Sequence, residues 1–428
     1  MNYVGIRKED KNIWEKRVPL IPNHIKTLVE KENINFLVES FVERAFTDSE
    51  FENAGAKVTD NIDDAKFVFG VKEVPIDKIL EDKVYMFFSH TIKGQDYNMP
   101  LLQKIIDSKS TLIDYEEIKD DDGKRLVFFG KYAGFAGMID TLHGIGKRWA
   151  SFGIKNPFEE IKPAYLYKDL IEAQKKIREV AENIALNGLP AGMNGLVIGI
   201  TGYGNVSQGV QEILDILPNT EISPYQLLED KTKLTGIIKV VFKESDLAIP
   251  TNPRTKFNLQ EYYESPERYK SKFEQYLPFM DVIMNSIYWN EKYPVLVSKE
   301  YLKSKEKHRL SIIGDITCDI GGSIEITYKS TESDNSTFVY NHKTDSFKDG
   351  YEGEGVAVVA VDNLPAELPT DASVAFSETL NRFIPGIVNA DYNNSFLDVD
   401  MPPEIKRAVI VYNGKLTPDF EYLNEYLK

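Results

Sequence analysis

Short apolar runs alternate with amphipathic helical patterns along the first third of the chain. Between the runs, residues 22–32 and 98–108 carry apolar side chains at helical spacing, and Pro22 opens the first of these helices. This alternation predicts a parallel sheet that helices cover on both faces. The apolar runs, each predicted to form a strand, are residues 2–7, 35–40, 65–72, 83–90, 111–118 and 125–130.

The middle of the chain begins with two long predicted helices and continues with a second set of strands. Residues 132–153 and 167–188 have helical spacing, and the first of these segments is rich in small residues that allow close packing. We interpret both helices as connectors between two lobes. The later pattern predicts strands at 281–289 and 309–326, an antiparallel excursion at 336–365, and a helix at 371–389 that returns to the first lobe.

Composition narrows the class of protein. The chain has 428 residues, a formal net charge of −16 and 42% hydrophobic residues, which is typical of a soluble globular protein with two or three domains. Its charges are interleaved, and no basic patch indicates a nucleic-acid partner. The N-terminus lacks the apolar core of a signal peptide, and no apolar run approaches the roughly 20 residues of a membrane span. We therefore expect a cytoplasmic protein without a membrane partner.

Metal and disulfide chemistry are not expected. Cys318 is the single cysteine, so an internal disulfide is excluded, as in many proteins of a reducing compartment. The five histidines are scattered, and with one cysteine they give no spacing typical of a zinc site. We expect structural roles for Cys318 and for His24, His143, His308 and His342.

A glycine-rich turn at residues 202–206 predicts a dinucleotide site. An apolar run precedes it and an amphipathic segment follows, as in a strand, turn and helix that bring backbone N–H groups against a pyrophosphate. Gly202 suits a turn with positive φ, and Gly204 lets the chain approach phosphate without a Cβ. Ser207 replaces the usual third glycine, so a purely structural turn remains the alternative. The residues predicted to bind the cofactor here are Gly202, Tyr203, Gly204, Asn205 and Val206.

The choice of coenzyme is predicted from the end of the next apolar run. NAD-binding domains usually have an acidic residue there that holds the ribose 2′-OH. This chain has Ser223, with Glu221 two positions earlier. Because a small polar residue leaves room for a 2′-phosphate, we favour NADP(H) over NAD(H), although no arginine is near in sequence.

Chemistry-bearing residues stand at the ends of the strands predicted for the first lobe. In an open parallel sheet, ligands bind beyond the carboxyl ends of the strands. A solvated surface charge, a structural histidine or a helix cap is the ordinary explanation for each residue alone. Together, a desolvated lysine and a histidine can move protons while a cofactor moves hydride. The strand-end residues are Arg7, Lys72, Glu73, His90 and Glu116.

Eight segments of the sequence also resemble a known family when they are taken in order. They are RKEDKNIWEKRVPLIPNHI, GVKEVP, FFSHTIKGQ, LIDYE, FGKYAGFAGMIDTLHGIG, GITGYGNVSQG, NSIYW and VDNLPAELP. The chain resembles the lysine–ketoglutarate reductase domain of the bifunctional enzyme of lysine degradation. That domain is grouped with saccharopine dehydrogenase (L-lysine-forming) and, more distantly, with alanine dehydrogenase and the transhydrogenase NAD-binding domain. No saccharopine-cleaving domain follows here, so we expect a free-standing reductase.

The resemblance implies a fold and a reaction. The fold class is α/β, with two Rossmann-like doubly wound parallel-sheet domains, a cleft between them, and long helices that join them. Residues 1–132 plus 370–428 would form the substrate domain, with the dinucleotide-binding domain at 133–369 inserted. The implied enzyme condenses the ε-amine of L-lysine with 2-oxoglutarate and reduces the imine with NAD(P)H to saccharopine. Assembly as a homo-oligomer stays open.

The resemblance also assigns roles to single residues. Lys72 and His90 match the acid–base pair, Glu116 the carboxylate that tunes the lysine, and Arg17 and Arg125 the arginines that bind substrate carboxylates. Arginine suits this task because a guanidinium binds a carboxylate through two hydrogen bonds. Further candidates are Glu73, Asp315 and Asp319 for substrate, and Asn285, Asn363 and Leu364 beside the nicotinamide half of the cofactor.

Two other classes of function compete with this prediction. The first is an alanine-dehydrogenase-like or other amino-acid dehydrogenase, which would use ammonia in place of lysine. The second is a non-catalytic NAD(P)-binding protein, such as a sensor or one subunit of a proton-translocating complex. Such a protein has no need for Lys72, His90 and Arg17 together, so their presence favours an enzyme.

Overall fold

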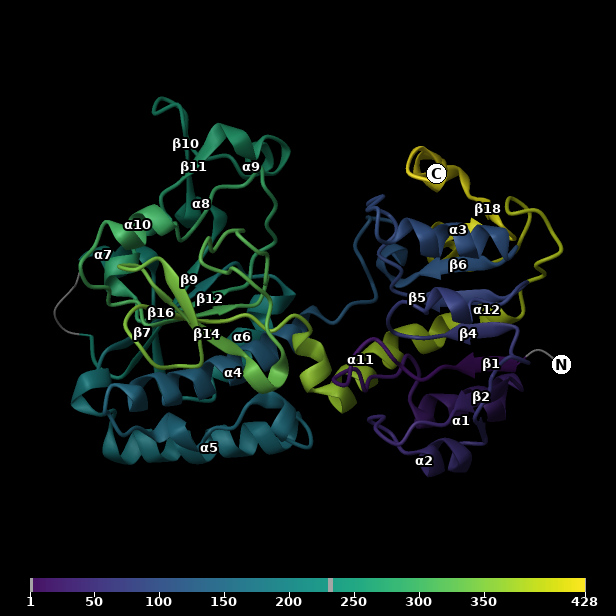
Figure 1. Ribbon diagram of the computed structural model, residues 1–428, viewed down its shortest axis with the longest axis horizontal. Helices are drawn as coiled ribbons and strands as arrows, with labels where there is room; N and C mark the ends of the chain where they lie inside the picture. The colour runs from purple at the N-terminus through teal and green to yellow at the C-terminus, as the bar shows by residue number, and fades with distance from the viewer. Residues whose placement is uncertain (1–2, 230–233, 428) are drawn as a thin grey trace. The chain divides into compact units, whose positions relative to one another are not determined.

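The computed structural model describes residues 3–229 and 234–427, and it divides into two compact units. The first unit consists of Met1–Phe129 and Pro369–Lys428, and the second of Gly130–Leu368. Figure 1 shows that each unit is built on its own sheet with helices packed against it. Among the described residues, no helix is both long and apolar enough to cross a bilayer.

The sheet of the first unit has eight strands in the order β18-β17-β6-β5-β4-β1-β2-β3. The six strands from β6 to β3 are parallel, while β17 is antiparallel to both β6 and β18. Every residue of β4, β5 and β6 is buried, because helices cover both faces at the centre of the sheet. The strands are β1 (Tyr3–Ile6), β2 (Asn35–Glu39), β3 (Lys57–Thr59), β4 (Phe67–Phe69), β5 (Val84–Phe87), β6 (Thr111–Asp114), β17 (Val409–Tyr412) and β18 (Lys415–Leu416).

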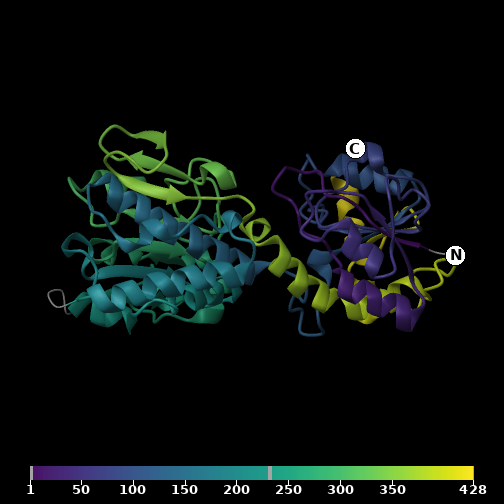
Figure 2. The same ribbon diagram turned by 90° about the horizontal axis from the view of Figure 1, so that it is seen from below.

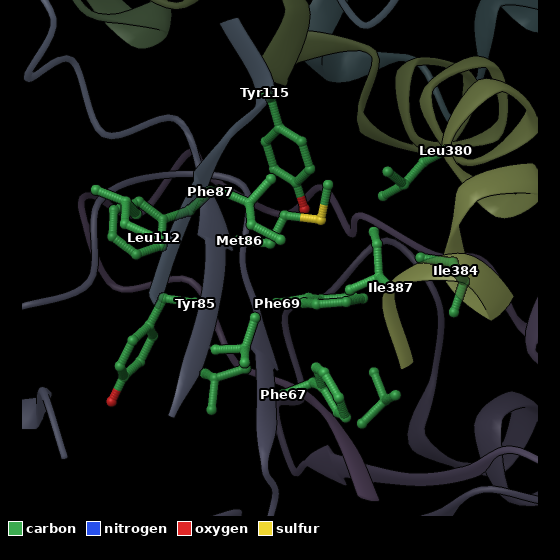
Figure 3. Packing of buried hydrophobic residues seen from close by; sticks show 14 of the residues in the cluster. Phe67, Phe69, Tyr85, Met86, Phe87, Leu112, Tyr115, Leu380, Ile384 and Ile387 are labelled. Carbon is green, nitrogen blue, oxygen red and sulfur yellow. The ribbon is translucent and has the colours of Figure 1, made fainter. Parts of the chain in front are cut away.

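Helices from both ends of the chain complete the first unit. Figure 3 shows Ile384 and Ile387, from the last third of the chain, facing Phe69 and Phe67 of β4. Full burial of such side chains stabilises the unit by roughly 2 kcal/mol each. The predicted return of residues 371–389 to the first lobe is therefore what is observed. The helices are α1 (Pro22–Glu32), α2 (Asp48–Asn53), α3 (Met99–Asp107), α11 (Pro369–Leu380), α12 (Ile384–Val388) and α13 (Pro403–Arg407).

Two sequence-based assignments in the first unit are corrected. Residues 125–130, predicted as a strand, make only one isolated bridge, between Arg125 and Lys119. They cannot pair with β6, because β17, a strand from the far end of the chain, already pairs with that edge of β6. The elements α2 and β3 were missed, although Thr47 and Glu50 form a capping box that signals the start of α2.

The sheet of the second unit also has eight strands, in the order β15-β14-β16-β13-β12-β7-β9-β8. The strands from β16 to β8 are parallel, and β14 runs antiparallel to both β15 and β16, as the predicted excursion required. The strand β8 does not pair with β7, because β9 lies between them. The strands are β7 (Leu196–Thr201), β8 (Asn219–Ile222), β9 (Ile237–Phe242), β12 (Val282–Asn285), β13 (Ile312–Asp315), β14 (Thr337–Asn341), β15 (Ser346–Asp349) and β16 (Val356–Val359), with β10 (Ala248–Pro250) and β11 (Tyr269–Ser271) as a separate pair.

Two long helices and several short ones pack on this sheet. Glycines allow α4 and α6 to approach closely, since a Cβ at Gly134 would lie 2.0 Å from the Val206 carbonyl oxygen, and one at Gly209 2.2 Å from that of Lys131. Figures 1 and 2 show α5 along the outside of this layer. The helices are α4 (Gly130–Ser151), α5 (Leu170–Asn187), α6 (Asn205–Leu214), α7 (Pro224–Glu229), α8 (Glu244–Leu247), α9 (Leu259–Glu264) and α10 (Lys299–Lys303).

Candidate active site

The carboxyl ends of four adjacent parallel strands gather the candidate catalytic residues of the first unit. The strands β6, β5, β4 and β1 are neighbours in the sheet, so the segments that leave them emerge at one edge. Lys72 and Glu73 follow β4, His90 follows β5, and Glu116 follows β6. The placement of these residues from strand ends alone agrees with the structure.

Lys72 is half-buried among charged neighbours. Burial and then the nearby Arg17 guanidinium lower the pKa of the Lys72 ammonium, and Lys11 adds to this effect, while Glu15 and Glu73 oppose it. A lysine with a lowered pKa is partly neutral closer to physiological pH and can accept a proton. The environment therefore makes Lys72 a candidate general base.

Glu73 joins His90 and Lys11. Its Oε1 lies 2.6 Å from His90 Nδ1, and its Oε2 lies 3.0 Å from Lys11 Nζ. Although burial opposes it, the hydrogen bond to His90 and the charge of His90 and Lys11 lower the pKa of Glu73 to about 2. The carboxylate thus stays ionised, orients the imidazole through Nδ1 and leaves Nε2 for other chemistry.

The backbone around His90 is held in an uncommon conformation. His90 has a φ of 52°, in the left-handed region, and Asn98 Nδ2 donates to its carbonyl oxygen at 2.8 Å. The buried Asp114 carboxylate accepts the backbone N–H of Ser89 at 2.9 Å and that of Glu116 at 2.7 Å. Asp114 therefore ties the segments that carry His90 and Glu116 to each other. Sequence analysis missed this residue.

Arg17 is a buried cation in a compact polar and aromatic environment. Its Nε donates to Glu15 Oε1 at 2.8 Å, Nη2 pairs with Glu15 Oε2, and the guanidinium lies 4.2 Å from the centroid of the Phe129 ring. Glu15 and Arg17 are each no more than 2% exposed. The ion pair and the ring fix the plane of the guanidinium.

Arg125 stands on the same side of the sheet as Glu116. Its Nη1 lies 3.2 Å from Glu116 Oε1, and its guanidinium lies 5.2 Å from the centroid of the Phe88 ring. Phe88 in turn stacks on the His90 ring, with 6.4 Å between centroids. The Phe88 ring therefore contacts both His90 and Arg125, and Arg125 in turn pairs with Glu116. The side chains of Glu116 and Arg125 are part-exposed, which leaves them accessible to a ligand.

Glu9 is a second buried carboxylate that sequence analysis missed. Its two oxygens accept the backbone N–H groups of Val71 at 2.7 Å and Lys72 at 3.0 Å. Burial raises the pKa of Glu9 to about 7; Arg7 opposes this shift and Glu15 adds to it. Glu9 therefore positions the backbone of Lys72. Its only sequence signal is a carboxylate three residues beyond a buried strand.

Glu9→Gln should change how stability depends on pH. The pKa of Glu9 is about 7 in the folded state against an ordinary 4.5. Between these two values, Glu9 keeps its proton in the folded state but has lost it in the unfolded state, and this difference stabilises the folded state at lower pH. This stabilisation is complete below the unfolded pKa and disappears as the pH rises through 7. From pH 5 to pH 8, the unfolding free energy of the wild type should fall by about 2.5 kcal/mol relative to that of Glu9→Gln.

Denaturant unfolding of both proteins at pH 5, 6.5 and 8 measures this difference. Glu52→Gln, at an exposed position of α2, controls for the loss of one carboxylate from the same unit. Parallel pH profiles for wild type and Glu9→Gln would contradict the assignment.

The second unit carries the glycine turn between β7 and α6. Gly202 has a φ of +82°, which favours glycine, and its N–H donates to the Phe242 carbonyl oxygen of β9 at 2.8 Å. A Cβ added at Gly204 would meet no protein atom within 4 Å. The open space beside Gly204 and the N-terminus of the ten-residue helix α6 fit a pyrophosphate. Tyr203, Asn205 and Val206 lie at this turn, where the sequence predicted them.

The position of Ser223 requires a correction. Ser223 directly follows β8, as predicted, and its hydroxyl donates to Gln226 Oε1 at 3.0 Å. However, β8 is the outermost strand, and β9 separates it from β7. In dinucleotide-binding domains, the residue that binds the ribose follows the strand next to the glycine turn. That strand is β9 here, so Ser223 does not occupy this position.

Asn285 and Asp315 are the last residues of the adjacent strands β12 and β13. Their side chains belong to one buried network of hydrogen bonds. Asn285 Nδ2 donates to Asp315 Oδ1 at 2.8 Å, and the Thr327 hydroxyl donates to Asp315 Oδ2 at 2.6 Å. Asn285 is 0% and Asp315 1% exposed. Both side chains are buried in this network, and contact of either one with substrate or cofactor stays a prediction.

The remaining candidates of the second unit lie in loops. Asp319 is exposed four residues beyond the end of β13. Asn363 precedes a 3₁₀ turn at Leu364–Glu367, and Leu364 is 3% exposed within the core. Leu364 contributes apolar packing in this conformation. The contacts of Asp319 and Asn363 with ligands stay predictions.

Comparison with known proteins places these features in a family. The family models described as alanine dehydrogenase/PNT, N-terminal domain and C-terminal domain match residues 5–136 and 242–419. Among solved structures, L-alanine dehydrogenase covers the whole chain with a TM-score of 0.63 and 17% identity. A transhydrogenase from Sinorhizobium meliloti covers 98% of it with a TM-score of 0.57 and 14% identity. These likenesses confirm the predicted α/β class with two mostly parallel sheets.

Curated relatives share more of the sequence. The chain is 38% identical to alpha-aminoadipic semialdehyde synthase of Arabidopsis thaliana and 33% identical to the mitochondrial protein of that name in Mus musculus, over 98% and 99% of its length. It spans only 41% and 47% of those two relatives. It is also 26% identical to saccharopine dehydrogenase (NAD(+), L-lysine-forming) of Emericella nidulans, over 89% of this chain and 90% of that protein. The two domain models of one family match residues 5–136 and 242–419, more than half of the chain in total, so the chain belongs to the alanine dehydrogenase/PNT family.

Proposed function

We propose that this chain is an oxidoreductase that condenses L-lysine with 2-oxoglutarate and reduces the resulting imine with NAD(P)H to saccharopine, reversibly. The observation that carries the proposal is the cluster at the carboxyl edge of the first sheet, where a lysine of lowered pKa adjoins a Glu73–His90 pair and two arginines. The names of the curated relatives, which include saccharopine dehydrogenase, support the same reaction.

The chemistry requires a base and an acid near neutral pH. The ε-ammonium of lysine must lose a proton before it attacks the ketone, and the carbinolamine must lose water to become an imine. Lys72 is the candidate base, because burial and Arg17 lower the pKa of its ammonium. His90, oriented by Glu73, is suited to donate the proton that leaves with water. Glu116, which pairs with Arg125, stays a candidate for tuning this pair, although the carboxylates that raise the pKa of Lys72 here are Glu15 and Glu73.

The arginines suit the substrates. Lysine and 2-oxoglutarate together bring three carboxylates, and guanidinium groups bind carboxylates through paired hydrogen bonds. Arg17 and Arg125 are each held in place by one carboxylate and one aromatic ring. Glu73 and Asp319 remain candidates for the substrate amines.

The second unit is the candidate dinucleotide domain. The open space at Gly204, the positive φ of Gly202 and the N-terminus of α6 fit the pyrophosphate of NAD(P)H. When bound, the nicotinamide would supply the hydride. Asn363 is the candidate residue near this ring. The earlier preference for NADP(H) rested on Ser223, which does not end the strand beside the glycine turn, so Ser223 no longer supports it.

Initial rates with single omissions test this function. NAD(P)H oxidation should require lysine and 2-oxoglutarate together and should stop when either is left out. Turnover with pyruvate and ammonia but not with lysine would favour an alanine-dehydrogenase-like enzyme. Binding of NAD(P)H without turnover on any pair of amine and keto acid would favour a non-catalytic protein. A cytoplasmic location and a homo-oligomeric state stay predictions.

A further inference from the structure

A carboxylate follows closely after the strand beside the glycine turn. β7 and β9 pair in parallel from Leu196↔Ile237 to Thr201↔Phe242, so the residues after Phe242 run alongside the turn that starts at Gly202. The hydrogen bond from the Gly202 N–H to the Phe242 carbonyl oxygen, at 2.8 Å, continues this register by one step. Glu244 is two residues beyond Phe242. Sequence order alone points to β8, whereas the sheet brings β9 to this position.

Glu244 lines a pocket with the turn itself. The pocket has a volume of about 310 Å³, and its lining includes Gly202, Tyr203, Gly204 and Glu244. The Tyr263 hydroxyl donates to Glu244 Oε1 at 2.6 Å and fixes the orientation of the carboxylate. Burial and the Glu244 charge raise the pKa of the Tyr203 phenol, in agreement with a carboxylate close to the turn.

The pocket has aromatic walls suited to a nucleoside. Tyr262 and Tyr293 contact each other edge to face, with 5.2 Å between ring centroids, and both belong to the lining. Aromatic rings bind a purine base by stacking, and a carboxylate at the same site can accept hydrogen bonds from the two ribose hydroxyls. An adenosine 2′-phosphate would bring a second negative charge against the Glu244 carboxylate.

Lys243 is the adjacent residue of opposite charge. Its side chain is exposed and is not part of the pocket lining. Its Nζ lies 5.9 Å from the centroid of the Tyr203 ring, and its backbone N–H donates to Asp246 at 3.0 Å. The residue that faces the pocket is therefore the carboxylate and not the lysine.

We propose that Glu244 binds the adenosine ribose of the coenzyme and makes this chain select NAD(H) over NADP(H). The proposal rests on the dinucleotide binding that the proposed function assigns to the second unit, but not on the identity of the amine or keto acid. It assigns the specificity to the end of β9, in place of Ser223 at the end of β8.

Equilibrium binding tests the proposal without substrates. NADH and NADPH are titrated separately into the full-length chain, and the dissociation constant is read from coenzyme fluorescence. The wild type should bind NADH at least roughly tenfold more tightly than NADPH. Glu244→Ser should weaken binding of NADH by about tenfold and strengthen binding of NADPH. The ratio of the NADPH to the NADH dissociation constant should then fall to near one or below it. Glu244→Gln keeps an acceptor for Tyr263 and should also reduce the ratio.

Glu221→Gln on β8 is the matched control. It removes a carboxylate near the end of the other candidate strand, while Lys239 keeps Asp215 as an ion-pair partner at 2.8 Å. The ratio should not change in this variant. Tighter binding of NADPH by the wild type, or a ratio that is unchanged in both Glu244 variants, would overturn the proposal. Binding of neither coenzyme would overturn the proposed function itself, whereas NADH selectivity without turnover of lysine would contradict only the reaction.

Discussion

Lys72→Met should lower kcat for NAD(P)H oxidation with lysine and 2-oxoglutarate by about 10²- to 10⁴-fold, the usual contribution of a positioned acid–base group. Methionine keeps the length and the apolar stem of the side chain but cannot accept or donate the proton. Because Lys72 follows β4 in the first unit and the glycine turn belongs to the second, the dissociation constant of the coenzyme should stay within about twofold of the wild-type value.

The pH profile separates a catalytic role from a structural one. In the wild type, a limb at a pH below the ordinary lysine range should reflect the lowered pKa of Lys72. That limb should be absent from the residual rate of Lys72→Met. Lys57→Met, at an exposed position of β3, is the control for removal of one lysine. Retained turnover in Lys72→Met, or equal loss of coenzyme binding, would mean that Lys72 is not the base.

Gly204→Val should weaken binding of the coenzyme by about 10- to 100-fold without unfolding the protein. The backbone at Gly204 has a φ of −74°, which valine adopts without strain. A Cβ at this position meets no protein atom within 4 Å, so the added methyl groups occupy only the space assigned to the pyrophosphate. Fluorescence titration with NADH and NADPH measures the loss, and the thermal midpoint should change little.

Gly204→Ala gives a graded comparison. Its single methyl group should cause a smaller loss of affinity than valine. Equal affinities for wild type, alanine and valine would show that the turn does not hold the pyrophosphate. A large fall in the thermal midpoint of Gly204→Val would instead indicate that the turn is needed for folding.

The elements of the fold were largely predictable from sequence, but their order within the sheets was not. Runs such as 83–90 and 111–118 became β5 and β6 because apolar runs of that length are buried in a parallel sheet. Strand order depends on contacts between segments far apart in the chain, which local patterns do not contain. For that reason the insertion of β9 between β7 and β8, and the pairing of β17 with β6, were both missed.

The same limit separates the site residues that were predicted from those that were missed. Lys72, Glu73, His90 and Glu116 were found because strand ends converge in a parallel sheet whatever their chemistry. Glu9 and Asp114 act by holding backbone N–H groups, and Glu244 acts through the order of the strands. The roles of these three residues cannot be predicted until it is known which segments lie side by side in space.

The destination of the hydride tests the central claim most directly. The enzyme is supplied with lysine, 2-oxoglutarate and NAD(P)H that carries deuterium at both C4 positions, and the products are analysed by mass spectrometry and NMR. We predict saccharopine with one deuterium, on the carbon that was the ketone of 2-oxoglutarate. Deuterated 2-hydroxyglutarate, or deuterated glutamate when ammonia is present, with no labelled saccharopine, would contradict the account.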